Sequence, residues 1–275
     1  MLHTRLMVAG LFVVAAACSS SGVTTPVSTA SDLVVTSDIA MAAADGAAED
    51  VDVMTGMNGA PGNISADVGG GIANSLGSWR PGLTGCTFAS GSFTCPDTLR
   101  NGLHVTRVVT LLNAAGGTMS AYDSLLTASI HIVADISGDR THGPWSATVA
   151  RHHDITVTGL AGTETSRTFN GSGNETVSQS RVLRNDSTRS YTITGTSTIT
   201  NVVMPVRSTD GGNGWPTSGT ITRTMTVTLT SGPNAGKTET KTMTITFDGT
   251  STPSGSIDGH TFTIDCTNHT ATPRS

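Results

Sequence analysis

Threonine occupies every second position in two neighbouring stretches of the chain, Thr220–Thr230 and Thr238–Thr246. Most positions between these threonines are apolar, and residues 231–236, which join the stretches, are rich in turn formers. Side chains alternate between the two faces of a strand, so each stretch predicts a strand with one hydroxyl face and one apolar face. If Thr230 pairs with Thr238, the two threonine rows face each other in one long antiparallel hairpin.

The same period-two alternation continues through most of the chain after residue 85. Further strands are predicted at 103–112, 126–136, 145–158, 163–169, 175–183 and 189–203, with a short pair around Asp258-Gly259. No helical pattern separates them, so the predicted fold is all-β, a long antiparallel meander. The sheet is expected to be open or partly rolled, because apolar residues are too few for two fully buried inner faces; a closed barrel and a two-layer fold remain alternatives. The segments 163–169 and 175–183 are polar on both faces, so they are expected to project past the core or to lie at an edge of the sheet.

Cys86 and Cys95 flank a segment that is symmetric about Ser90-Gly91, a sequence typical of a two-residue turn. Such a turn makes Phe88 and Phe93 a non-hydrogen-bonded pair of the hairpin, and the two cysteines another. The Cα atoms of such pairs approach most closely, so a disulfide is predicted. It is expected to stabilise the hairpin by about 2–4 kcal/mol.

The first 17 residues have the pattern of a bacterial lipoprotein signal peptide. Arg5 supplies positive charge, residues 6–14 are apolar, and Ala15-Ala16-Ala17 precede Cys18. The last four residues resemble a lipobox, and this resemblance implies that Cys18 is acylated, with palmitate among its acyl chains, and anchors the protein to a membrane. Ser19, in a place where Asp is often an inner-membrane retention signal, favours the outer membrane of the cell envelope. A plain secretory signal peptide is the alternative.

The rest of the chain divides by composition. The prediction is a lipid-attached flexible tether at 18–35, an amphipathic helix at 36–56, a Gly-rich linker at 57–84, an antiparallel β domain at 85–267 and a disordered tail at 268–275. Four acidic residues share one face of the helix: Asp38, Asp45, Glu49 and Asp52. This face is expected to be solvated; a cation or partner site is the alternative.

Removal of residues 1–17 leaves 14 basic and 20 acidic residues, a net charge of −6. This balance argues against a nucleic-acid partner and against electrostatic attraction to anionic lipid. Contact with the membrane is therefore expected only through the lipid anchor, since no later segment is long and apolar enough to span a bilayer.

The sequence offers no strong catalytic or metal-binding motif. A Gly-x-Ser-x-Gly nucleophile motif is missing from the sequence, and no catalytic residue is predicted. The one histidine cluster consists of His131, His152, His153 and Asp154. With Ile136 opposite Trp145, the side chains of His131, His152 and Asp154 would share the polar face of the sheet and could hold one ion. Two histidines meeting by chance on a wet face explain this cluster better, so no metal and no cofactor is predicted.

Together, the lipobox, the Cys86–Cys95 hairpin and the threonine-rich meander resemble a group of uncharacterised β-rich bacterial lipoproteins. The segments Arg167–Ser172 and Gly259–Asp265 add to this resemblance, which covers about residues 84–266. It implies no activity. The expected function is a structural or binding module with a protein or glycan partner. The alternatives are a hydrolase or metal-dependent enzyme with a site built from loops and, more remotely, ice binding by the threonine rows.

Overall fold

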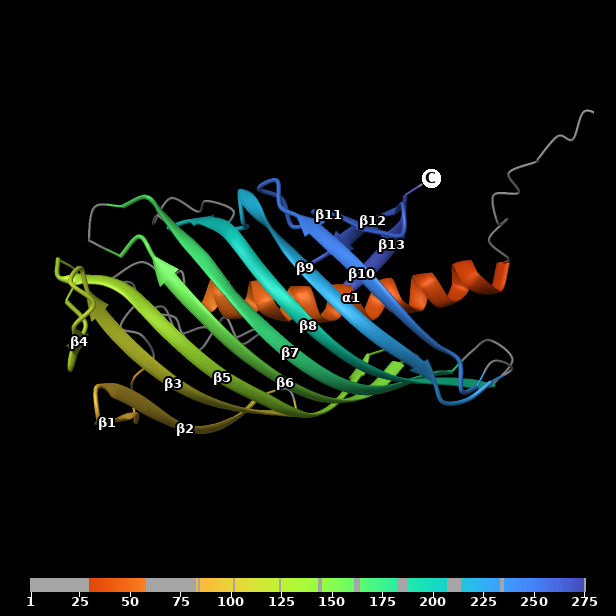
Figure 1. Ribbon diagram of the computed structural model, residues 1–275, viewed down its shortest axis with the longest axis horizontal. Helices are drawn as coiled ribbons and strands as arrows, with labels where there is room; N and C mark the ends of the chain where they lie inside the picture. The colour runs from red at the N-terminus through yellow and green to blue at the C-terminus, as the bar shows by residue number, and fades with distance from the viewer. Residues whose placement is uncertain are drawn as a thin grey trace, which may run out of the picture.

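The computed structural model describes residues 30–57, 83, 85–100, 102–123, 125–142, 145–160, 164–182, 187–206, 214–232 and 235–274. The predicted signal peptide, Cys18 and most of the predicted linker therefore lie outside the described residues. One helix, α1 (Ala30–Met57), precedes thirteen strands that form a single antiparallel sheet (Figure 1). The prediction of an all-β meander with one N-terminal helix is confirmed.

The strands are β1 (Thr87–Ala89), β2 (Ser92–Arg100), β3 (Leu103–Asn113), β4 (Thr118–Met119), β5 (Thr127–His142), β6 (Trp145–Thr158), β7 (Ser166–Val182), β8 (Thr188–Pro205), β9 (Ser218–Leu229), β10 (Thr238–Thr246), β11 (Ser254–Ile257), β12 (His260–Asp265) and β13 (Thr270–Pro273). They follow one another across the sheet in chain order, except that β4 pairs only with β3. We call the face toward α1 the inner face and the opposite face the outer face.

The threonine hairpin is formed by β9 and β10, with a register that differs from the prediction. Thr228, not Thr230, lies opposite Thr238. A shift by two residues leaves every side chain on its predicted face, because the side-chain period of a strand is two. Thr224 is accordingly exposed, and Val227 is fully buried.

The predicted edge strands at 163–169 and 175–183 are wrong. Residues Ser166–Val182 form one continuous strand, β7, in the interior of the sheet between β6 and β8. Its inner face reads as polar, but Arg167 and Glu175 on that face are buried. Glycine at 171 and 173 permits close approach of the neighbouring strand, since a Cβ at residue 171 would lie 2.3 Å from the carbonyl oxygen of Asp154.

The pairing of β5 with β6 and the C-terminal residues also differ from the prediction. Trp145 lies opposite His142 instead of Ile136, because β5 extends to His142 instead of ending at Ile136, whereas β6 has its predicted bounds. The predicted disordered tail at 268–275 is also wrong, since Thr270–Pro273 form β13. This strand pairs with β12, and its Ala271 amide donates to Met41 Sδ of α1 (3.4 Å).

The cysteine hairpin has the predicted register, with Phe88 opposite Phe93. Cys86 and Cys95 form a disulfide with a Cα–Cα distance of 4.0 Å. Ser90 and Gly91 both have positive φ values, as the central residues of a type I′ turn require. The two phenylalanine rings lie 4.9 Å apart.

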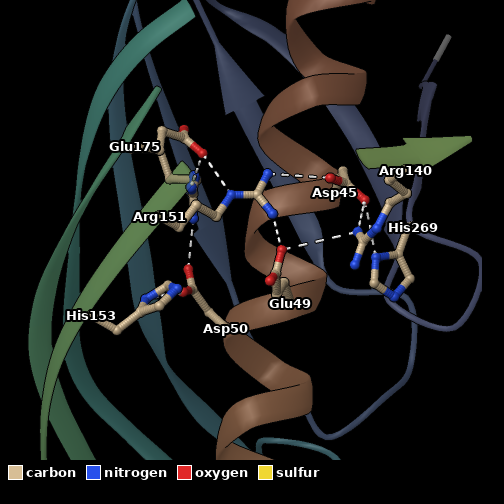
Figure 2. Close-up of polar contacts among 9 residues, drawn as sticks. Asp45, Glu49, Asp50, Arg140, Arg151, His153, Glu175 and His269 are labelled. Carbon is tan, nitrogen blue, oxygen red and sulfur yellow. Dashed lines mark hydrogen bonds and ion pairs between the residues drawn. The ribbon is translucent and has the colours of Figure 1, made fainter. Parts of the chain in front are cut away.

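The inner face of the sheet and α1 bury each other. Small side chains let the helix lie close to the strands, and its buried apolar residues include Ala40, Ala43, Ala44, Ala47, Ala48, Val51 and Met54. Asp38, Glu49 and Asp50 are also buried. The expectation of a solvated acidic face is therefore wrong. Figure 2 shows the strands curving around the helix at this point.

Candidate functional site

The acidic side chains of α1 meet arginines that project from the inner face of the sheet (Figure 2). We call this group the ion-pair cluster; it comprises Asp45, Glu49, Asp50, Arg140, Arg151, His153, Glu175, Arg223 and His269. Three acids come from α1, and Glu175 comes from β7. The remaining residues come from β5, β6, β9 and the turn before β13, so the cluster joins distant parts of the sheet to one helix.

Arg151 lies at the centre of the cluster, with a side chain only 2% exposed. Its guanidinium donates from Nη1 to Glu49 and from Nε to Glu175 Oε2 (3.0 Å). A third contact joins Nη2 to Asp45 Oδ2 (3.2 Å), and Arg140 Nη1 approaches Asp45 Oδ1 (2.7 Å). Pairing and hydrogen bonding of this kind are what a buried guanidinium needs, because an isolated buried charge is strongly unfavourable.

Arg223 forms the second centre. Its Nη1 donates to Asp50 Oδ2 (2.6 Å), and its Nη2 lies 2.8 Å from Glu175 Oε2. Gly46 of α1 makes room for this guanidinium, since a Cβ at residue 46 would lie 2.4 Å from Nη2 and 2.6 Å from Cζ. Glycine in the middle of a helix is unfavourable by itself. At this position it is explained by the arginine that packs against the helix backbone.

We expect Gly46→Ala to lower the free energy of unfolding by about 1–3 kcal/mol, because the new methyl group displaces a buried, doubly paired guanidinium. Helix propensity alone predicts the opposite sign, a gain of about 1 kcal/mol. Urea denaturation of the single variant and of Gly46→Ala in an Arg223→Met background separates the two effects. The alanine should be stabilising once the arginine is gone; a stabilising effect in both backgrounds contradicts the proposed contact.

The N-terminal part of α1 is held in the same way, further along the sheet. Asp38 accepts from Arg181 Nη1 (2.6 Å), Arg189 Nη1 (3.3 Å) and the Tyr191 hydroxyl (2.5 Å). Burial and the hydrogen bond to Asp38 both raise the pKa of Tyr191. The guanidinium of Arg181 also lies over the ring of Trp145, 5.1 Å from its centroid.

Two carboxyl groups of the cluster, those of Glu175 and Asp45, have lowered pKa values. Burial alone would raise the pKa of Glu175, but the charges of Arg223 and Arg151 and their hydrogen bonds outweigh burial and lower it. Burial acts upward on Asp45 as well. Its hydrogen bond with His269 and the charges of Arg151 and Arg140 bring the pKa of Asp45 well below its ordinary value. Both groups are therefore ionised in the folded protein at neutral pH.

These pKa directions predict acid destabilisation. A carboxyl whose pKa is lower in the folded chain stabilises the fold above its unfolded pKa, and this contribution disappears as the pH falls toward the folded pKa. We expect the urea midpoint to fall as the pH is lowered from about 5 to about 2. Glu175→Gln, which is less stable at neutral pH, should show a shallower decline over this interval. Equal slopes for the wild type and the variant would contradict the assignment.

The cluster has little capacity for nucleophilic catalysis. Ser197, His153 and Asp50 are close together and buried, but His153 Nδ1 faces Asp50 Oδ1 (3.2 Å). A serine nucleophile needs the other ring nitrogen as its base. His153 Nε2 has no hydrogen-bond partner among the described residues, so Ser197 is not hydrogen-bonded to it. The three side chains do not form a catalytic triad.

His131, His152 and Asp154 share the outer, polar face of the sheet, as predicted. On the outer face, His131 pairs with Asp154 and His152 with Asp135, each at 2.7 Å. His153 lies on the inner face, in the ion-pair cluster. Within the described ranges, no three His, Cys, Asp or Glu side chains are arranged to hold a metal ion.

A second feature lies on the outer face, where β8, β9 and β10 carry fifteen threonines in register. We call it the threonine face; its rows are Thr192–Thr228–Thr238, Thr194–Thr226–Thr240, Thr196–Thr224–Thr242, Thr198–Thr222–Thr244 and Thr200–Thr220–Thr246. None of the fifteen is buried. Hydroxyl pairs join β9 to β10, as at Thr226 and Thr240 (3.1 Å).

The strands that flank the threonine face continue its chemistry. The outward positions of β7 next to it are Ser172, Asn174, Thr176 and Ser178, and those of β11 are Ser254 and Ser256. These positions and the fifteen threonines carry no charged and no aromatic side chain. The result is a hydroxyl-rich, uncharged surface across five strands.

The sequence predicts the threonine ladder between β9 and β10, but it does not predict the pairing of β8 with this ladder or the ion-pair cluster. A signal for the cluster was present in the alternation of β9, where Arg223 occupies an apolar-face position between Ile221 and Met225. Arg151 similarly occupies one of the alternating positions of β6 whose side chains are buried. Arginine at an inward strand position beside an acidic helix indicates a buried ion pair, because an arginine there needs an acidic partner.

No helix in the described part of the chain has the length and apolarity needed to cross a bilayer. Comparison of the chain with protein-family models, with curated proteins and with solved structures found no match.

Proposed function

We propose that the protein is a lipid-anchored binding module of the bacterial cell envelope that contacts its partner through the threonine face. The observation that carries the proposal is the register of fifteen solvent-accessible threonines over three strands. Threonine favours strands, but strand propensity alone does not require the same residue at every outward position. The inner face, by contrast, is partly covered by α1, which pairs with buried arginines there.

The sequence before α1 supports the envelope location. The lipobox-like Ala15-Ala16-Ala17-Cys18 would attach the chain to a membrane, more readily the outer than the inner one. α1 then joins this anchor to the sheet through ion pairs at Asp38, Asp45, Glu49 and Asp50. The helix thus connects the anchor to the inner face of the sheet, and the outer face remains accessible to a partner.

The chemistry of the threonine face restricts the partner. Without charged side chains it offers nothing to nucleic acid or to anionic lipid headgroups. Without aromatic rings it cannot stack on sugars. A partner must therefore be an uncharged surface that exchanges many hydrogen bonds, such as a neutral glycan or a polar protein surface.

Crosslinking pull-down from intact cells tests this proposal. Thr224→Lys places a charge in the centre of the threonine face, and Ala150→Lys places the same charge at an exposed outward position of β6. Loss of the captured partner with the first variant and its retention with the second are the expected results. If both variants capture the same partner, the threonine face is not the binding surface. Cys18→Ala tests the anchor separately, by release of the protein from the membrane fraction.

Ice binding is a second candidate, favoured by the regularity of the array. Neighbouring threonines repeat at about 4.8 Å between strands and about 6.7 Å along them, a two-dimensional lattice of hydroxyl and methyl groups. Strand twist opposes this function, because a lattice match needs a flat surface. Thermal hysteresis in a concentrated solution of the wild type that disappears in Thr224→Lys would establish it; absence of hysteresis in the wild type removes this candidate.

A further inference from the structure

α1 contacts the sheet in the way that a bound ligand contacts its binding site. Asp38, Met41, Asp45, Glu49 and Asp50 of α1 make their hydrogen bonds to the sheet domain through their side chains. No backbone–backbone hydrogen bond connects the helix to a strand among the described residues. The helix is therefore held by side-chain contacts and is not part of the backbone hydrogen-bonding of the sheet.

Helix and inner face are complementary in charge. α1 contains six acidic residues and no basic residue. The mature chain without α1 has fourteen of each sign, so the helix carries the whole net negative charge. Five arginines of the sheet pair with these acidic residues: Arg140, Arg151, Arg181, Arg189 and Arg223. Complementary charges of this kind select a partner and fix its register.

The connection between α1 and β1 does not oblige the helix to dock on its own sheet. Residues 58–84 separate Met57 from the start of the β domain. A chain of that length reaches about 90 Å when fully extended, about twice the length of α1. Exchange of an identical element between two copies preserves every contact of the interface, so its free energy is set by concentration and by the connecting segment.

We propose that the inner face is a binding site for an acidic, alanine-rich helix, and that a second copy of this chain supplies that helix in an exchanged dimer. Each sheet then holds α1 of the other copy through the same ion pairs. The helix of the same chain competes as an intramolecular ligand at a fixed effective concentration, so exchange increases as chains become concentrated. This inference does not depend on the partner of the threonine face.

A disulfide between α1 and β13 distinguishes the two arrangements. Met41 Sδ and the Ala271 amide are 3.4 Å apart, so cysteines at these positions can meet only when the helix occupies the sheet. One full-length chain carries Met41→Cys and a second, with a different tag, carries Ala271→Cys. Cys18 and Cys266 are changed to alanine in both. The chains are unfolded in urea, mixed, refolded together at increasing concentration and oxidised, which removes any kinetic barrier to exchange.

The expected product is a covalent heterodimer whose fraction rises with chain concentration. One control chain carries both substitutions and should form the disulfide within itself at low concentration, which shows that the pair can react. A second control replaces Ala271→Cys by Thr224→Cys on the outer face and should give no heterodimer above the background of random collisions. If the doubly substituted chain closes its disulfide while the mixed chains stay monomeric at every concentration, the inner face accepts only its own helix and the proposal is wrong.

Discussion

Replacement of Arg223 by methionine should lower the free energy of unfolding by about 3–5 kcal/mol, the range for breaking a buried ion pair by removal of one partner. Among the described residues, Arg223 is the only arginine that pairs with Asp50, whose side chain is 0% exposed. Without it, Asp50 keeps only the 3.2 Å contact with His153. Glu175 still has Arg151, so the main loss falls on Asp50. Urea denaturation at neutral pH measures the effect.

Two further variants show whether the loss comes from the pair. Arg274→Met removes an exposed arginine that donates to Thr263 and should change stability by less than about 0.5 kcal/mol. Asp50→Leu combined with Arg223→Met removes both charges and should recover most of the lost stability, because apolar replacement of a whole buried pair is often neutral. Equal effects of Arg223→Met and Arg274→Met would show that the cluster contributes nothing to folding.

Removal of the disulfide by the double substitution Cys86→Ala and Cys95→Ala is expected to destabilise the protein by about 2–4 kcal/mol. The bond closes a loop with a sequence separation of 9 and ties β1, the first strand at this edge, to β2. Loss of the crosslink increases the conformational freedom of the unfolded chain more than that of the folded one. The measurement is the urea midpoint of the variant beside that of the oxidised wild type.

Reduction of the wild type with a thiol is the matched control, because it opens the same bond without changing a side chain. Both treatments should lower the midpoint to a similar extent. An alternative result is a midpoint that stays constant while amide exchange rises only in residues 87–94. That result would show that β1 detaches locally and that the disulfide does not contribute to the stability of the whole sheet.

Much of the sheet could be predicted from local pattern. Period-two alternation places Thr224 outside and Val227 inside whatever the register, since the observed pairing of Thr228 with Thr238 differs from the predicted one by two residues. The turn at Ser90-Gly91 fixes the pairing of Cys86 with Cys95 for a similar reason, because a two-residue turn leaves one register. These features depend on residues close together in the chain.

The tertiary structure decided which polar residues are buried. Asp38 and Glu49 on α1, Glu175 on β7 and Arg223 on β9 read as solvated or unassigned residues in the sequence, because each is polar and its partner lies far away in the chain. They are buried because the sheet curves around α1 and brings opposite charges from different elements within hydrogen-bond distance. The free energy of a charge depends on its surroundings as well as on its type, and those surroundings exist only in the folded chain.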